Sequence, residues 1–164
     1  MSLTCKDVMG IEQSTLRPVD TVSTAFHLMR QKGIRFLPVV AEDGTYIGVF
    51  TSPTLIKLLL PRAITIQMSG KGSKSLSNLG FYHVDEEDFH DALIEEKDEP
   101  VINHLSDPDN IPIVSPDTPM MEGILLLHKY KRHVIVVEPK TGRFVGVVSI
   151  NSVLRKIFDK DYEV

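Results

Sequence analysis

A short segment rich in glycine, serine and lysine contains residue types that could bind phosphate. It reads Gly70-Lys-Gly-Ser-Lys-Ser75. Glycine-rich loops cradle phosphates with backbone N–H groups, and a lysine and a Ser/Thr hydroxyl complete such sites. The segment lacks the Gly-x-x-x-x-Gly-Lys-Ser/Thr spacing, and no buried strand leads into it. We therefore interpret 69–80 as a mobile linker loop.

Histidine and cysteine are the other residue types that could support catalysis or metal binding. Cys5 is the only cysteine and has no histidine near it in sequence, so we interpret it as a packing residue. His83 and His90 flank an acidic stretch two helical turns apart, which is too far for a close ligand pair. The other histidines are scattered, and folding would have to gather them around a metal. The sequence therefore predicts no catalytic residues and no metal site.

Composition limits the classes of protein further. The chain has 164 residues, of which 42% are hydrophobic and 24% charged, as in one ordinary globular domain or two small ones. A net charge of -4 gives no general affinity for nucleic acid. No apolar stretch approaches the roughly 20 residues of a membrane span, and no segment near Met1 reads as a signal peptide. A single cysteine allows no intramolecular disulfide, and we expect a cytoplasmic protein without membrane insertion.

The chain contains an internal repeat. The segment 15–29 aligns with 112–126, so that Asp20 falls on Asp117, Thr21 on Thr118 and Leu28 on Leu125. Farther on, Arg35 falls on Arg132, and after one inserted residue in a turn Gly48 falls on Gly146. A weaker echo, Lys6-Asp-Val-Met9 and Ile102-Asn-His-Leu105, precedes the copies. Order, glycine positions and hydrophobic pattern agree over about 45 residues, which indicates a duplication.

Each copy predicts the order β-α-β-β-α. In the first copy Val22, Ala25, Phe26 and Met29 form one apolar helix face, and Gly33 can end that helix. Nearly continuous apolar runs predict buried strands. The expected strands are 15–17, 36–40 and 46–51 in the first copy and 113–115, 134–137 and 144–149 in the second, with closing helices at 54–60 and 152–158.

Capping and turn residues fix the boundaries of these elements. Asp20-Thr21 and Asp117-Thr118 offer N-cap chemistry, and Pro119 suits a first helical position. Asp43-Gly44 and Thr141-Gly142 predict hairpin turns.

The segment 61–99 has no counterpart in the repeat. After the expected loop, 85–97 predicts a capped helix with Phe89, Ala92 and Leu93 on one side. Its other faces are acidic, which fits either a solvated surface or contact with a basic partner. The predicted organisation is a first repeat over 1–60, an insert over 61–99 and a second repeat over 100–164.

Six short segments, distributed over the two copies, carry a recognisable pattern. They are Asp7-Val-Met9, Ser115-Pro-Asp-Thr118, Phe36-Leu-Pro-Val-Val40, Val134-Ile-Val-Val137, Gly48-Val-Phe-Thr51 and Gly146-Val-Val-Ser149. Their pattern resembles the CBS domain family (cystathionine-β-synthase domains). The resemblance implies an α/β (α+β) fold in which two β-α-β-β-α CBS repeats pack with pseudo-twofold symmetry as a Bateman module, with a loop-helix insert between them. It also implies a homodimer, and we expect its apolar face to include Met29, Leu55, Leu58, Met120 and Met121.

The family resemblance also implies a site for an adenosine-containing ligand between the repeats. The Ser/Thr that ends each Gly-h-h-Ser/Thr motif is expected to bond the ligand, and an Asp three residues later to hold the ribose. Here those ribose positions carry Thr54 and Ser152, which weakens the expected grip. Basic residues before the second strand are expected to face the phosphate. The implied site residues are Thr15, Leu16, Arg35, Leu37, Pro38, Thr51, Thr54, Ile113, Arg132, His133, Ile135, Ser149 and Ser152.

The expected function is a regulatory ligand-sensing module without catalytic activity. No cofactor is required, and the candidate ligands are AMP, ADP, ATP and S-adenosylmethionine. Because no effector domain is visible in the sequence, a separate protein would be regulated. The alternative is a dimerisation scaffold that has lost nucleotide binding, which the missing ribose aspartates favour.

Overall fold

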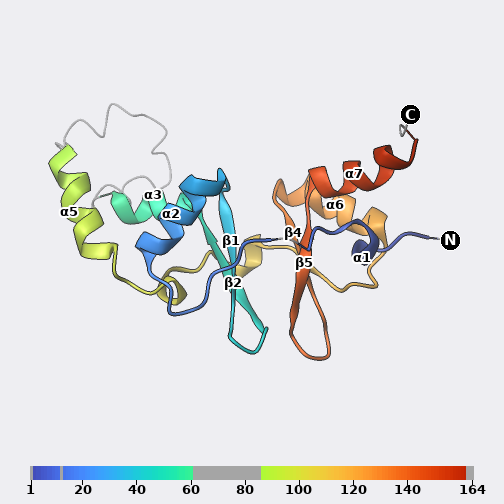
Figure 1. The fold of residues 1–164 in the computed structure, drawn as a ribbon, viewed down its shortest axis with the longest axis horizontal. Helices are drawn as coiled ribbons and strands as arrows, with labels where there is room; N and C mark the ends of the chain where they lie inside the picture. Colours follow the sequence, from blue (N-terminus) through green and yellow to red (C-terminus); the bar gives the residue numbers. More distant parts are fainter. Residues whose placement is uncertain (1, 12, 61–85, 162–164) are drawn as a thin grey trace. The chain divides into compact units, whose positions relative to one another are not determined.

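The computed structural model describes residues 2–11, 13–60 and 86–161, which are drawn in colour in Figure 1. The loop expected over 69–80 and His83 lie outside the described residues. The described residues form two compact units: one draws on 2–11, 13–18, 38–49 and 106–161, the other on 19–37, 50–60 and 86–105. The strands β1 (Phe36–Val40) and β2 (Tyr46–Thr51) contribute to both units.

The order of elements confirms the predicted α+β fold with two β-α-β-β-α copies. In the first copy a bridge between Leu16 and Val39 takes the place of the first strand, and α2 (Val22–Lys32), β1, β2 and α3 (Ser52–Leu59) follow. The second copy consists of β3 (Ile113–Val114), α6 (Met120–Tyr130), β4 (Val134–Val137), β5 (Phe144–Val148) and α7 (Ile150–Asp161). In chain order, α5 (Glu86–Glu96) and the short 3-10 helices η2 (Val101–His104) and η3 (Pro108–Asn110) come after the first copy and before the second.

The strands form two small sheets. β4 lies in the centre of one sheet, parallel to β3 and antiparallel to β5, with Ile113 opposite Ile135. β1 and β2 form the other sheet. Gly44 and Gly142 adopt positive φ angles of 95° and 72° in the hairpin turns, as the turn motifs predict. The two turns also bond each other, since Tyr46 N–H donates to the Gly142 carbonyl at 2.9 Å.

A short helical turn precedes each copy, close to the segments that echo each other in sequence. α1 (Cys5–Val8) precedes the first copy, and its Cys5 N–H donates to the Thr118 carbonyl at 2.7 Å, just before α6. η2 precedes the second copy, and its Val101 N–H donates to the Asp20 carbonyl at 2.8 Å, just before α2. The segment in front of each copy therefore holds the helix start of the other copy.

The core beneath the sheet of β3, β4 and β5 is aliphatic. Val134, Val136 and Val148 are fully buried and pack with Leu127 from α6 and Val153 from α7. α1 completes this cluster with Cys5 and Val8. These contacts fix α6 and α7 on β4 and β5, the elements that carry the candidate site.

Several predicted boundaries are wrong by one or two residues. Pro119 is the N-cap of α6 and not its first residue. The closing helices begin at Ser52 and Ile150, because Thr51 and Ser149 occupy their N-cap positions. Thr21 is the N-cap of α2 and Pro119 is the N-cap of α6. The structural alignment of the two helices is therefore shifted by one residue from the sequence alignment, which paired Asp20 with Asp117.

The predicted apolar dimer face is wrong at two of its five residues. Met29 and Leu55 are only 6% and 7% exposed, because they face the interior of the molecule. Met120 and Leu58 are half-buried, and Met121 is 59% exposed. None of the described helices is long and apolar enough to cross a membrane.

Candidate functional site

A pocket of about 660 Å³ opens in the second copy between α6, the loop that follows it and the start of α7. It combines apolar residues of α6 with basic and hydroxyl groups. Three of its residues, Arg132, His133 and Ser149, are site residues expected from the sequence. The lining consists of Ile124, Leu127, His128, Lys131, Arg132, His133, Ser149, Ile150 and Asn151.

The end of α6 positions the basic side chains. Lys131 is the C-cap and adopts the left-handed conformation with φ 56°, and its N–H donates to the Leu127 carbonyl at 3.0 Å. This cap turns the chain sharply into β4, so that Arg132 and His133 follow at the pocket. The Lys131 ammonium Nζ lies 3.3 Å from Nδ1 of His128, one turn earlier on α6. Lys131, Arg132 and His133 are all exposed.

The start of α7 contributes hydroxyl and backbone donors. Ser149 Oγ accepts from Ser152 N–H at 3.0 Å, and Ser152 Oγ accepts from Ser149 N–H at 2.9 Å. This reciprocal pair is a capping box. Among the described residues, no group accepts from the N–H of Ile150 or Asn151, the first two residues of the helix. Free N–H groups at a helix start, with the helix dipole, attract anions.

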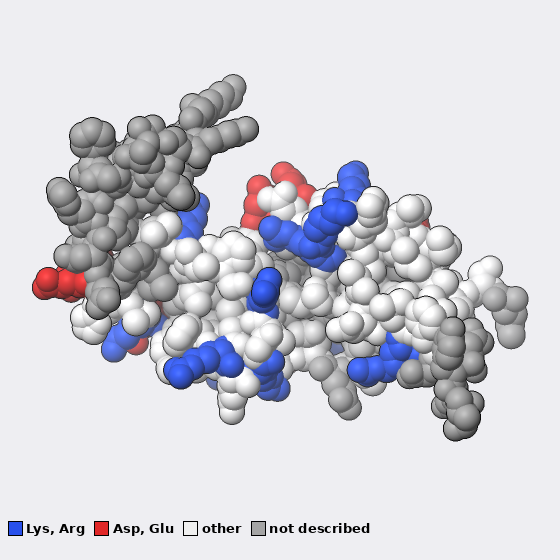
Figure 2. Space-filling model, turned by 90° about the horizontal axis from the view of Figure 1, so that it is seen from above, with Lys and Arg blue, Asp and Glu red and all other residues white. Residues whose placement is uncertain are grey.

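The electrostatics of the pocket favour an anion. The lining has two permanent cations, Lys131 and Arg132, and no acidic residue. Partial desolvation of the imidazole lowers the pKa of His133, which disfavours its charged form although the residue as a whole is exposed. Figure 2 shows more basic than acidic side chains on the face in view. A phosphate could be held here by a guanidinium, an ammonium and backbone N–H groups.

The first copy has fewer donors at the equivalent place. Ser52 N–H, at the first position of α3, donates to the Arg35 carbonyl at 2.8 Å, and the Ser52 hydroxyl donates to the same oxygen at 3.2 Å. Pro53 follows and has no N–H. Thr51 is 7% exposed, and its Oγ1 lies 3.1 Å from Thr54 Oγ1. The Arg35 side chain is exposed. The start of α3 is therefore a poorer anion site than the start of α7.

The remaining expected site residues do not line the pocket of the second copy. Leu16, Leu37 and Ile135 are at most 1% exposed and Pro38 is buried, whereas Thr15 is exposed and Ile113 is 49% exposed. Ser152 bonds its own helix start. Contact of these residues with a ligand stays a prediction.

Sequence reasoning missed part of the lining. His128, Ile150 and Asn151 were not expected there, although a helix that follows a Gly-h-h-Ser motif presents its first N–H groups beside the serine. The apolar α6 residues Ile124 and Leu127 have the spacing of a core-facing helix side, so the sequence does not indicate that they also line the pocket.

A comparison with family models matches the CBS domain at residues 5–61 and 105–159, one match in each copy. These matches cover more than half of the chain, and the chain belongs to the CBS domain family. Comparison with curated protein sequences finds no match.

Several solved structures have the same fold. CBSX2 from Arabidopsis thaliana, a CBS-pair protein, gives a TM-score of 0.70 at 18% identity and covers 100% of both chains. A structure of CBSX2 in complex with AMP gives 0.66 at 18% identity, covering 97% of this chain and 98% of that one. A putative acetoin utilization protein (AcuB) from Vibrio cholerae gives 0.67 at 14% identity, covering 98% and 93%.

Proposed function

We propose that this chain is a regulatory CBS pair that senses a phosphate-bearing adenine nucleotide and controls a separate protein. The phosphate would bind in the pocket of the second copy, against Lys131, Arg132 and the start of α7. Ser149 would add a hydroxyl donor. Figure 1 labels α6 and α7, the helices whose end and start line this pocket.

The difference between the two helix starts carries the proposal. At α7, the N–H groups of Ile150 and Asn151 have no acceptor among the described residues, and two cations stand beside them. At α3, the Arg35 carbonyl already accepts from the N–H of Ser52, the first residue of the helix, and Pro53, the second residue, has no N–H. The stability of the fold does not by itself require two cations beside backbone N–H groups that have no acceptor.

The adenine part of the proposal rests on a relative. CBSX2 has been solved in complex with AMP and shares the fold at 18% identity. Because Ser152 replaces the ribose aspartate of the family and is engaged in capping, we expect weak binding, on the order of tens to hundreds of micromolar.

The proposed role is not catalytic. The candidate nucleophile, Cys5, is 0% exposed, and burial raises the pKa of its thiol. Its sulfur packs against α6, where an added Cβ at Gly123 would lie only 2.8 Å from Sγ. A protonated, inaccessible thiol is a packing group.

Titration calorimetry of ATP, AMP and adenosine with the wild type and Arg132→Ala tests the proposal. We expect Arg132→Ala to weaken ATP binding at least about tenfold, since a charge-assisted phosphate bond contributes about 1.5–3 kcal/mol, and to leave adenosine binding unchanged. Arg30→Ala, an exposed arginine on α2 outside the pocket, is the matched control and should bind like the wild type.

Two results would contradict the proposal. Equal losses for ATP and adenosine would remove the phosphate role of Arg132. Absence of binding by every adenine compound at millimolar concentration would favour the second candidate, a dimerising scaffold. The exposed apolar residues of α6 and α7, Met121, Leu125, Ile150 and Leu154, favour that candidate.

A further inference from the structure

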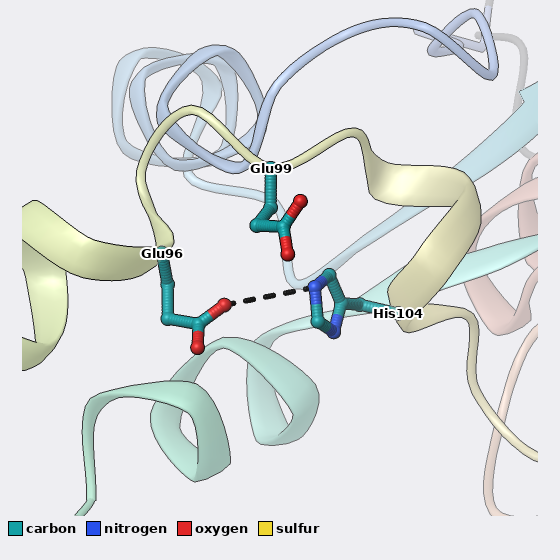
Figure 3. A group of neighbouring side chains, drawn as sticks. All are labelled: Glu96, Glu99 and His104. Carbon is teal, nitrogen blue, oxygen red and sulfur yellow. Dashed lines mark ion pairs between the residues drawn. The ribbon is translucent and has the colours of Figure 1, made fainter.

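Three metal-ligand side chains converge in the unit that contains α2, α3 and α5. They are Glu96, the last residue of α5, Glu99 in the following turn, and His104, the last residue of η2. Each offers one ligand atom, and these atoms lie within 4.8 Å of one another. Figure 3 shows the three side chains directed toward a common space. The sequence did not predict this group.

Backbone hydrogen bonds hold this segment on the start of α2. The Lys97 carbonyl accepts from Ser23 N–H and the Glu99 carbonyl from Val22 N–H, both at 2.9 Å. Two residues further, fully buried Val101 anchors η2. The positions of the three ligand residues are therefore fixed by the fold and do not depend on a metal.

The imidazole of His104 provides an independent observation. Its Nε2 is buried and has no hydrogen-bond partner among the described residues. Glu96 Oε2 lies 3.7 Å away, which is an ion pair only when the imidazole is protonated and is too long for a hydrogen bond. A buried polar atom without a partner is costly, and a cation between it and the carboxylate would satisfy both.

The distance of 3.7 Å between Nε2 and Oε2 suits a shared metal ion. Zinc binds imidazole nitrogen and carboxylate oxygen at about 2.0–2.2 Å, so two ligand atoms on one ion stand about 3.3–3.6 Å apart in tetrahedral geometry. Glu99 is exposed, so a small rotation of its side chain completes the set. Three protein ligands leave one position for water.

We propose that Glu96, Glu99 and His104 bind a divalent transition-metal ion of the zinc type. Two carboxylates balance the charge of the ion, and the imidazole favours such a metal over Mg²⁺ or Ca²⁺, which prefer oxygen ligands only. The ion joins the end of α5 to η2, and so ties the insert to the segment in front of the second repeat. This site is separate from the nucleotide pocket, and its test is independent of the proposed function.

Calorimetric titration of the full, chelator-treated chain with ZnCl₂ tests the site. The wild type should bind one Zn²⁺ at this site, and His104→Ala and Glu99→Gln should each lower its affinity at least about tenfold. The matched controls are His90→Ala and Glu95→Gln, which alter exposed residues of α5 outside the cluster and should leave the affinity unchanged.

Cobalt provides a spectroscopic readout of the same ligands. Co²⁺ added to the wild type should give visible absorption bands of a low-coordinate site, and Glu99→Gln should weaken them. Glu99 is exposed, so this variant should keep its fold and circular dichroism spectrum. Zn²⁺ affinity equal in wild type, Glu99→Gln and His104→Ala would overturn the proposal, as would wild-type binding weaker than on the order of 100 µM.

Discussion

Lys131 combines an unfavourable backbone conformation with a charge at the pocket. Among the described residues it is the only non-glycine with positive φ, and its counterpart in the first copy is Gly33, with φ 65°. Left-handed backbone costs a side chain about 1–2 kcal/mol relative to glycine. Residues kept in such conformations are often found at functional sites. The lysine therefore fits a binding role better than a capping role.

Replacement of Lys131 should change the stability of the fold and the affinity for ATP in opposite directions. We expect Lys131→Gly to raise the free energy of unfolding by about 0.5–1 kcal/mol, because glycine adopts this conformation without strain. The same variant should weaken ATP binding about threefold to tenfold, because it removes a cation. Urea denaturation and calorimetry measure the two effects.

Two further variants distinguish the effect of the left-handed backbone conformation from the effect of the lysine charge. Lys131→Asn tolerates the left-handed conformation without a charge, and should lose binding as Lys131→Gly does. Gly33→Lys, in the first copy, should destabilise the protein without altering ATP binding. Unchanged ATP affinity in both Lys131 variants would show that this cation does not contact the ligand.

The elements themselves were largely predictable. The strands 36–40, 46–51 and 134–137 agree with the structure at both ends, because short apolar runs between turn glycines leave little freedom. Helix starts were less accurate. A serine or threonine at the end of a strand can pair in the sheet or cap the next helix, and Ser149 caps α7.

The candidate site was only partly predictable. Family resemblance pointed to Arg132, His133 and Ser149, which line one pocket. The difference between the two helix starts was only partly visible in the sequence: Pro53 can be read there, but the Arg35 carbonyl that accepts from Ser52 N–H at α3 cannot. The Glu96–His104 pairing depends on the path of the chain between α5 and η2.

The capping pair of α7 leads to a prediction for the element. Ser152→Ala removes the acceptor of Ser149 N–H and should lower the free energy of unfolding by about 1 kcal/mol. Ser152→Asp keeps an acceptor and places a negative charge near the helix start, so it should retain wild-type stability. Chemical denaturation of the two variants measures the difference. Equal stability of wild type and Ser152→Ala would contradict the capping role.

At the scale of the whole molecule, amphipathic spacing did not reveal which apolar face is exposed. Met29 and Leu55 match the helical pattern, yet both are buried. Exposed apolar residues include the pair Met121 and Leu125 on α6 and the pair Ile150 and Leu154 on α7, besides single residues such as Ile56 on α3. Each pair is one helical turn apart and forms one stripe on its helix. Exposed apolar groups of this extent favour association, and a second copy of this chain is the partner that the family resemblance implies.

We expect the wild type to be a homodimer of about twice 18.4 kDa in light scattering coupled to size-exclusion chromatography. Leu125→Glu and Leu154→Glu should each give a monomer, because a carboxylate buried without a partner costs several kcal/mol, which raises the dissociation constant at least about 100-fold. Ile94→Glu on α5, where the isoleucine is 52% exposed, is the control and should remain dimeric. A wild-type mass of 18.4 kDa across a wide concentration range would contradict the dimer. A dimer that persists in both α6 and α7 variants would place its interface on another face.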